Sequence, residues 1–371
     1  MKSKLIKVLP YICGALIGFV GGFIGIGLNI NLDLNWIYLI PIMILQIIVF
    51  VVVHELSHGF VAEKNGLKFT VLYLGPFTFK RENNKFNKIK SFGKQLTYVG
   101  RAQIDNFQIL NEEDVEKARK AWIKALKAGP LSDLILGTTT ICIGLIFKWN
   151  LLIISTVIIF VLISIPSYIM GDGKHMKLIK KDKIFTDVIL YTYSIIGNTP
   201  ISRESISFLL QKIENNIEKT NVNKDNLISL ALSAQSLYTD AICNNKEDLS
   251  PNINEIVEVT IENKNIFLNK QIESSYYKGL INIAIMYEVL IKNNKERALE
   301  LYKHVKKEKH NMPGEKLDFY RVEHTLGIAN RKGEILNENL MNPIFKGCEG
   351  VESMERIINE LILEKSKIIY T

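Results

Sequence analysis

The residues best suited to chemistry in this chain are the histidines and the glutamate of His54-Glu55-Leu56-Ser57-His58. Residues four apart share one face of a helix, so both imidazoles point the same way and can bind one metal ion. Glu55 lies beside them, where it can take a proton from metal-bound water. The spacing predicts one zinc ion per chain, with Glu55 as general base. The alternative is a short polar patch at a helix end, without a metal.

The elements that must position these residues are long apolar runs. Each is long enough to cross a hydrocarbon core, which needs about 17–25 helical residues. Ionisable groups at that depth are costly to insert, and they are functional by default. We therefore predict a mainly α-helical transmembrane domain over residues 1–176, with the histidines in the second span. The predicted spans cover residues 5–30, 36–62, 131–147 and 150–170.

Lysine and arginine residues predict how the spans are oriented. The amino terminus, the long loop 63–130 and the segment after residue 173 are basic, whereas the loop 31–35 carries only Asp33. Because cytoplasmic loops are rich in Lys and Arg, we expect a multi-pass cell-membrane protein with both termini in the cytoplasm. The formal net charge of +8 fits an anionic lipid surface. No basic patch is interleaved with aromatic residues, so we expect no nucleic-acid partner.

A catalytic zinc site needs a third protein ligand, since two histidines leave it incomplete. Glu82 is the nearest candidate in sequence, and Asp172 follows the fourth predicted span. The second and fourth spans run in the same direction, so His58 and Asp172 both reach the inner face. This topology favours Asp172, although an Asp-Gly pair can also simply end a helix.

With these motifs in order, the chain resembles the site-2 proteases, which are intramembrane zinc metalloproteases. The resemblance covers about the first 175 residues. It rests on His54 to His58, on Gly129-Pro130 with a polar residue three positions later, and on Asp172-Gly173. It implies that His54, His58 and Asp172 are the zinc ligands, that Glu55 is the catalytic acid and base, and that membrane-anchored proteins are the substrates.

Asp133 departs from the family pattern, which usually has asparagine at this position. An asparagine amide could donate to a developing oxyanion, whereas an ionised aspartate could not. Asp133 could be protonated in an apolar site, could orient a ligand histidine, or could have a structural role. The sequence leaves these three interpretations open.

The loop 63–130 contains two kinds of element. Residues 67–104 alternate and are rich in β-branched and aromatic types, which predicts a small β-hairpin sheet. The resemblance implies that such a sheet presents the substrate as an added strand, and a cytoplasmic β-loop without substrate contact is the alternative. Residues 112–128 predict a basic amphipathic helix, able to lie on the inner leaflet or in solvent.

Residues 177–371 are polar and have helical periodicity, which predicts a cytoplasmic α-helical domain. Segments 274–292 and 294–309 read as a helix, an Asn-rich turn and a second helix. The second has the rhythm of tetratricopeptide repeats, but no regular 34-residue period is present. Such an array binds a protein or peptide partner, or it is a cap without a ligand. We expect His304, His310 and His324 to be exposed.

Three functions fit the chain to different degrees. An intramembrane endopeptidase accounts for the motif, its depth and the returning topology together. A catalytically inactive membrane receptor or scaffold would keep the helices without needing Glu55. A transporter would need polar residues along several spans, and the first and third predicted spans offer few. We therefore favour the endopeptidase.

Overall fold

The computed structural model describes residues 38–75, 77–82, 85–89, 100–199, 201–268, 271–310, 313–337 and 349–365. The predicted first span, residues 5–30, lies outside them. The chain divides into two units. The first unit contains Met1–Ile104 and Lys120–Leu178, and the second contains Asp105–Arg119 and Ile179–Thr371.

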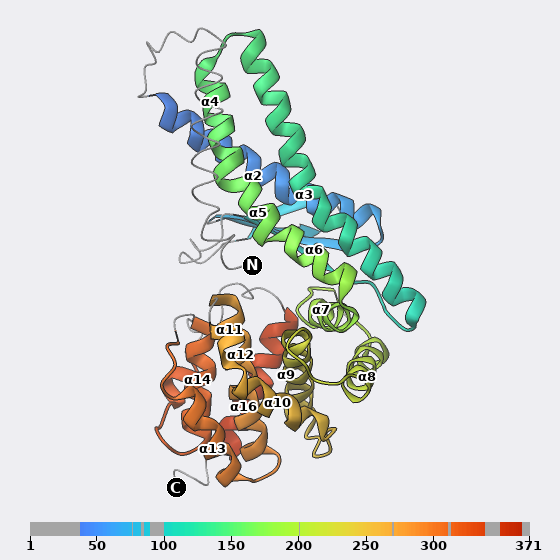
Figure 1. Ribbon diagram of the computed structural model, residues 1–371, viewed down its shortest axis with the longest axis vertical. Helices are drawn as coiled ribbons and strands as arrows, with labels where there is room; N and C mark the ends of the chain where they lie inside the picture. The colour runs from blue at the N-terminus through green and yellow to red at the C-terminus, as the bar shows by residue number, and fades with distance from the viewer. Residues whose placement is uncertain are drawn as a thin grey trace. The chain divides into compact units, whose positions relative to one another are not determined.

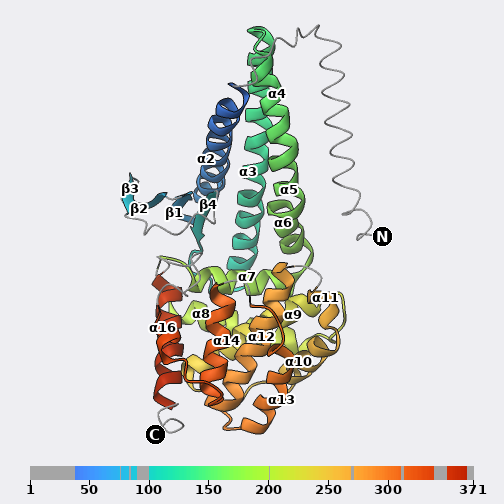
Figure 2. The ribbon, with the colours of Figure 1, turned by 90° about the vertical axis from the view of Figure 1, so that its left-hand side faces the viewer.

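Long apolar helices dominate the first unit. Stretches Leu39–Lys64, Glu112–Ile146 and Asn150–Lys181 are long and apolar enough to cross a membrane. They correspond to α2 (Leu39–Lys64), to α3 (Glu112–Ile146), and to α4 (Asn150–Ile159), η2 (Phe160–Ser164), α5 (Ile165–Met170) and α6 (Asp172–Lys181) in succession. Figures 1 and 2 show these helices side by side. Ile40, Leu45 and Ile135 are 60–66% exposed, as suits side chains that face lipid.

Helix α3 is continuous, whereas we predicted an amphipathic helix over residues 112–128 and a separate span from residue 131. Pro130 lies inside the helix. A proline lacks the N–H that would bond one turn back, which bends a helix but need not end it when neighbouring elements satisfy the freed groups. The Gly-Pro pair is therefore an interruption within one helix and not a boundary between two.

The fourth predicted span is interrupted twice before it reaches Asp172. Residues Phe160–Ser164 form a π-helical turn just before Pro166, and such turns accommodate the hydrogen bond that a proline cannot make. At Gly171 the backbone leaves the helical region, with φ −99° and ψ −111°. A new helix, α6, begins at Asp172. This second break places the Asp172 carboxylate in the first turn of α6.

A small sheet packs against α2, which confirms the predicted β insertion in coarse form. Its strands are β1 (Lys68–Leu74), β2 (Phe77–Glu82), β3 (Lys85–Ile89) and β4 (Gly100–Asp105), in the order β3-β2-β1-β4. Strands β1 and β2 are antiparallel, with Val71 opposite Lys80 and Leu74 opposite Phe77. A Cβ atom on Gly59 of α2 would lie 2.2 Å from the Phe69 ring. The missing side chain therefore lets β1 approach the helix that carries the histidines.

Ten helices are described in the second unit besides the start of α3. They are α7 (Lys183–Ile195), α8 (Arg203–Lys219), α9 (Leu227–Asn244), α10 (Asn252–Glu262), α11 (Lys264–Leu268), α12 (Gln271–Leu290), α13 (Lys295–Val305), α14 (Pro313–Thr325), α15 (Lys332–Ile335) and α16 (Glu349–Lys365). Helix α12 packs against α9, α13 and α14. Helices α12 and α13 form the predicted helix-turn-helix, with Asn294 capping Arg297 N–H. The likeness to tetratricopeptide repeats stays a prediction.

The prediction that His324 is exposed was wrong, since it is only 2% exposed. Its Nδ1 accepts a hydrogen bond from Arg331 N–H at 3.1 Å. One turn away, the buried Arg321 donates to Asn359 at 2.9 Å and to Asp318 at 3.1 Å. Charged and polar residues on α14 thus face inward, because partners on neighbouring elements satisfy them.

Candidate metal centre

The two histidines of α2 have their Nδ1 atoms engaged by α3. His58 Nδ1 lies 2.7 Å from the carbonyl oxygen of Ala125. A carbonyl oxygen only accepts, so His58 Nδ1 must carry the proton. His54 Nδ1 lies 3.0 Å from Asp133 Oδ2, where an ionised carboxylate likewise accepts. In the neutral imidazoles, both Nε2 atoms are then unprotonated and each presents a lone pair.

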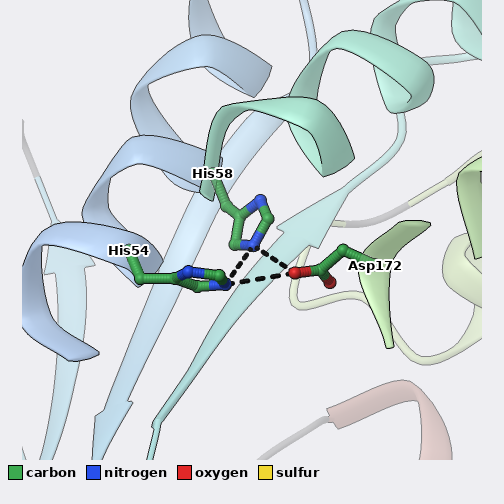
Figure 3. Close-up of side chains that lie close together, drawn as sticks. All are labelled: His54, His58 and Asp172. Atoms are coloured by element: carbon green, nitrogen blue, oxygen red, sulfur yellow. Dashed lines mark hydrogen bonds and ion pairs between the residues drawn. The ribbon is translucent and has the colours of Figure 1, made fainter. Parts of the chain in front are cut away.

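Both Nε2 atoms and one carboxylate oxygen converge at the same point (Figure 3). The Nε2 atoms of His54 and His58 are 3.0 Å apart, and Asp172 Oδ2 lies 3.1 Å and 3.3 Å from them respectively. Three electron-rich atoms this close repel one another unless a proton or a cation lies between them. These side chains come from α2 and α6, in two of the candidate membrane spans.

The donor set fits zinc. Tetrahedral zinc with nitrogen and oxygen ligands at about 2.0–2.2 Å places those ligand atoms about 3.3 Å apart. The three observed separations of 3.0 Å, 3.1 Å and 3.3 Å are close to that value. Two imidazoles with one carboxylate are a common ligand set for catalytic zinc, which keeps its fourth position open. Among the described residues, His54, His58 and Asp172 are the group that meets the geometry for a metal ion.

Close packing against the two histidines requires a glycine at position 129, just before Pro130 in α3. A Cβ atom at this position would lie 2.4 Å from His58 Nε2 and 2.6 Å from His54 Nε2. These separations are far below van der Waals contact, and they fall on the atoms that converge. Without a side chain at residue 129, α3 can come close enough for Ala125 and Asp133 to reach the two rings.

Asp133 lies beside His54, on the side of the ring away from Asp172. Its side chain is 6% exposed, and its Oδ2 accepts from His54 Nδ1. A carboxylate that accepts from the outer nitrogen of a metal-bound imidazole fixes the orientation of the ring and raises its basicity. Of the three interpretations of Asp133, this geometry favours the one in which it orients a ligand histidine.

Glu55 contacts strand β4 in addition to sharing α2 with the histidines. Its Oε2 accepts a hydrogen bond from Ala102 N–H at 2.7 Å. A Cβ atom on Gly100 would lie 2.4 Å from Val51 Cγ1 and 2.9 Å from Glu55 Cγ. The backbone of β4 therefore packs directly on the part of α2 that carries the predicted general base.

The structure brings His54, His58 and Asp172 together, with Asp133 hydrogen-bonded to His54 and Glu55 bonded to Ala102 of β4. It does not bring Glu82, the other candidate ligand, into the metal-binding group. Glu82 is the last residue of β2, and Lys85 is its strand partner. Sequence reasoning missed the contributions of Ala125, Ala102 and Gly129. Ala125 and Ala102 act through backbone atoms, and Gly129 acts through the absence of a side chain. The Gly129-Pro130 motif was the available signal for Gly129.

The chain matches a known protein family. The model of peptidase family M50 matches residues 42–345, which is most of the chain. The chain belongs to peptidase family M50. This is the site-2 protease family, so the resemblance noted in the sequence is confirmed. The match begins inside α2 and continues well beyond residue 175, where the sequence resemblance ended, so the M50 peptidase family model also takes in most of the helices after α6.

No curated protein matches the chain significantly, and no solved structure does. M50 membership supports a membrane-associated peptidase of the zinc-dependent kind. The roles of individual residues rest on the geometry of the site.

Proposed function

We propose that this chain is an intramembrane zinc metalloendopeptidase that hydrolyses peptide bonds of membrane-anchored substrates at or below the lipid surface. The observation that carries the proposal is the convergence of His54 Nε2, His58 Nε2 and Asp172 Oδ2 within 3.3 Å of one another. A receptor or scaffold has no need for three electron-rich atoms held this close. One zinc ion per chain would be held by these three atoms.

When bound, zinc would lower the pKa of a water molecule to about 7 and polarise the scissile carbonyl. The remaining steps belong to side chains. Glu55 takes the proton from the attacking water and passes it to the leaving amine. His54 and His58 would present their Nε2 lone pairs to the metal, because Asp133 and the Ala125 carbonyl accept from their Nδ1 atoms. Gly129 leaves the space in which the rings meet.

The sheet supplies a geometry suited to an extended substrate. Strand β4 is an outer strand in the order β3-β2-β1-β4, and it packs on α2 at Glu55. A substrate segment that pairs with the outer edge of β4 would lie beside the general base with its backbone extended. This supports the interpretation that the sheet contacts substrate, over that of a β-loop without such contact.

Orientation and partners remain proposals from the sequence. The turn between α3 and α4 carries a single basic residue, Lys148, whereas α6 carries Lys174, Lys177, Lys180 and Lys181 at the other end of the same span. This asymmetry supports a cytoplasmic location for α6 and for both termini. The lipid bilayer surrounds the spans, and the helical domain 177–371 takes a protein or peptide partner.

The test measures zinc content and cleavage for the wild type and for Glu55→Gln, purified in detergent micelles. The probe is a library of synthetic single-span peptides, and mass spectrometry identifies the fragments. We expect one zinc ion per chain in both proteins. Cleavage by Glu55→Gln falls about 10²–10⁴-fold, as for the loss of a general base. Equal cleavage by both proteins would rule out the mechanism and leave the receptor or scaffold.

A matched control is Glu63→Gln, which changes a glutamate two turns further along α2. Glu63 lies 2.5 Å from Arg81 and is outside the metal-binding group. Its glutamine variant keeps an oxygen that accepts from Arg81. We expect it to cut the library at the wild-type rate, which shows that the loss in Glu55→Gln depends on position.

A further inference from the structure

Strand β4 joins the residues around Glu55 to a segment held by the second unit. Residues up to Ile104 belong to the first unit, and Asp105 begins the second. Ala102 donates its N–H to Glu55, and Asp105 follows only three residues later. A β-strand rises about 3.3 Å per residue, so about 10 Å of extended chain separates the two positions. Both residues belong to the same strand, Gly100–Asp105.

Asp105 is anchored by backbone N–H groups of the α7–α8 loop. Its Oδ2 accepts from Asn198 N–H at 2.9 Å and from Thr199 N–H at 2.8 Å, and the residue is fully buried. A Cβ atom on Gly197 would lie 3.2 Å from Oδ1, so a glycine here lets the loop close on the carboxylate. Hydrogen bonds to an ionised acceptor are among the stronger ones in proteins.

The residues after Asp105 are held by the same part of the second unit. Asn106, which is also fully buried, donates to Leu190 O at 2.7 Å and to Ser194 Oγ at 3.0 Å. Gln108 Oε1 accepts from Ser202 N–H at 2.9 Å. Ile109 N–H donates to Ser205 Oγ at 2.9 Å. Four of the five residues from 105 to 109 are thus bonded to α7, to α8 or to the loop between them.

We propose that Asp105 is a positioning residue for Glu55, acting through β4. By fixing the carboxyl end of the strand, Asp105 keeps Ala102 N–H on the Glu55 carboxylate. The α7–α8 loop thereby influences catalysis through the covalent path of the strand. The inference rests on the proposed function, because it assigns a consequence to the role of Glu55 as base.

If the α7–α8 loop positions Glu55, removing its contact with Asp105 should lower kcat. Zinc content and KM should stay unchanged. Asp105→Ala removes the acceptor for both loop N–H groups, and Asp105→Asn keeps one amide oxygen that can accept from them. Ser205→Ala weakens the same segment at a second point, Ile109. Asp182→Ala is the matched control. Asp182 also accepts a backbone N–H bond in the second unit, from Phe185 at 3.0 Å, but it lies outside the segment that follows β4.

The experiment uses the full chain, zinc-loaded, in detergent micelles. Hydrogen exchange read by mass spectrometry reports the amides of residues 100–104. Cleavage of the library peptide that the wild type cuts fastest gives kcat and KM. For Asp105→Ala we expect exchange at residues 100–104 to rise about tenfold and kcat to fall about 10- to 100-fold, as for a small misplacement of a catalytic group. KM and zinc content stay within about twofold of wild type, because the misplaced group acts in the chemical step.

Asp105→Asn and Ser205→Ala should show smaller changes in the same direction, so the inference can be tested even if Asp105→Ala fails to fold. Asp182→Ala should speed exchange in α7 while leaving kcat at the wild-type value. Wild-type exchange in β4 or wild-type kcat in folded Asp105→Ala would overturn the inference, and so would an equal loss of kcat in Asp182→Ala. If instead Glu55→Gln cleaves as well as wild type, the proposed function fails, and the exchange comparison still decides whether Asp105 fixes β4.

Discussion

The two ring nitrogens of each histidine have different partners. The Nε2 atoms converge with Asp172, and the Nδ1 atoms donate to α3, one to a carboxylate and one to a carbonyl. The two outer partners differ in charge. Asp133 adds a negative charge next to His54, whereas the Ala125 carbonyl is neutral. Together with Asp172, Asp133 would balance the two positive charges of a bound zinc ion, and an ionised Glu55 would add one further negative charge.

We expect Asp133→Ala to weaken zinc binding about 10- to 100-fold, which is the usual effect of removing an outer partner of a ligand histidine. Asp133→Asn should lose less, because its amide oxygen still accepts from His54 Nδ1–H while the charge is gone. Competition with a chelator measures the zinc affinity of each variant. Zinc binding by Asp133→Ala that is as tight as in the wild type would show that Asp133 does not orient His54 for the metal.

At the scale of elements, helix α3 must come close to α2 at one point. Gly129 faces the two imidazoles, and Gly137 lies two turns further along the same helix. A Cβ atom on Gly129 would lie 2.4 Å from His58 Nε2, but one on Gly137 would lie 3.5 Å from Phe160, which is ordinary contact. Glycine-to-alanine substitution at the two positions therefore distinguishes two effects. At Gly129 it tests the close approach of α3 to the histidines, and at Gly137 it tests the general effect of a methyl group on the helix.

Gly129→Ala should displace one of the rings and reduce bound zinc to well below one ion per chain, because a 2.4 Å separation cannot be tolerated. Gly137→Ala should keep its zinc and melt within a few degrees of the wild type. Metal analysis after gel filtration gives the zinc content, and circular dichroism gives the melting temperature. Full zinc occupancy in Gly129→Ala would show that α3 can move away without loss of the site.

At the scale of the whole molecule, the metal would join elements that are far apart in sequence. His54 and Asp172 are separated by 118 positions, and they lie in different candidate spans. A ligand that binds only the folded state stabilises it by about 4 kcal/mol at a thousand times its dissociation constant. Zinc should therefore contribute measurably to the stability of the first unit, which contains all three ligands.

Removal of zinc with a chelator should lower the melting temperature of the first unit by several degrees. Trp122 and Trp149 belong to that unit, and residues 105–119 and 179–371 contain no tryptophan, so tryptophan fluorescence does not report unfolding of the second unit. His54→Ala supplies the control, since it should already melt at the lower temperature and should not respond to the chelator. An equal response of wild type and His54→Ala would mean that the chelator acts elsewhere.

The sequence by itself predicted the chemistry of the site and the class of the fold. A helix fixes the relation of His54 to His58, because their four-residue spacing sets their direction whatever surrounds them. Hydrophobic length predicted the spans, and their alternating direction favoured Asp172 over Glu82. The spacing of the histidines is a local property, and the direction of a span depends on the number of spans before it. Both can therefore be read from the order of the residues.

Only the tertiary structure decided what Gly129, Asp133 and Ala102 contact. Their contributions depend on how closely α3 and β4 approach α2, which follows from packing between distant segments and not from local preference. The continuity of α3 through Pro130 and the second break at Gly171 were likewise decided by packing, since neighbours compensate for a missing hydrogen bond in one place and not in another. The inward side chain of His324 has the same origin, because a polar residue can be buried wherever a distant segment supplies its partner.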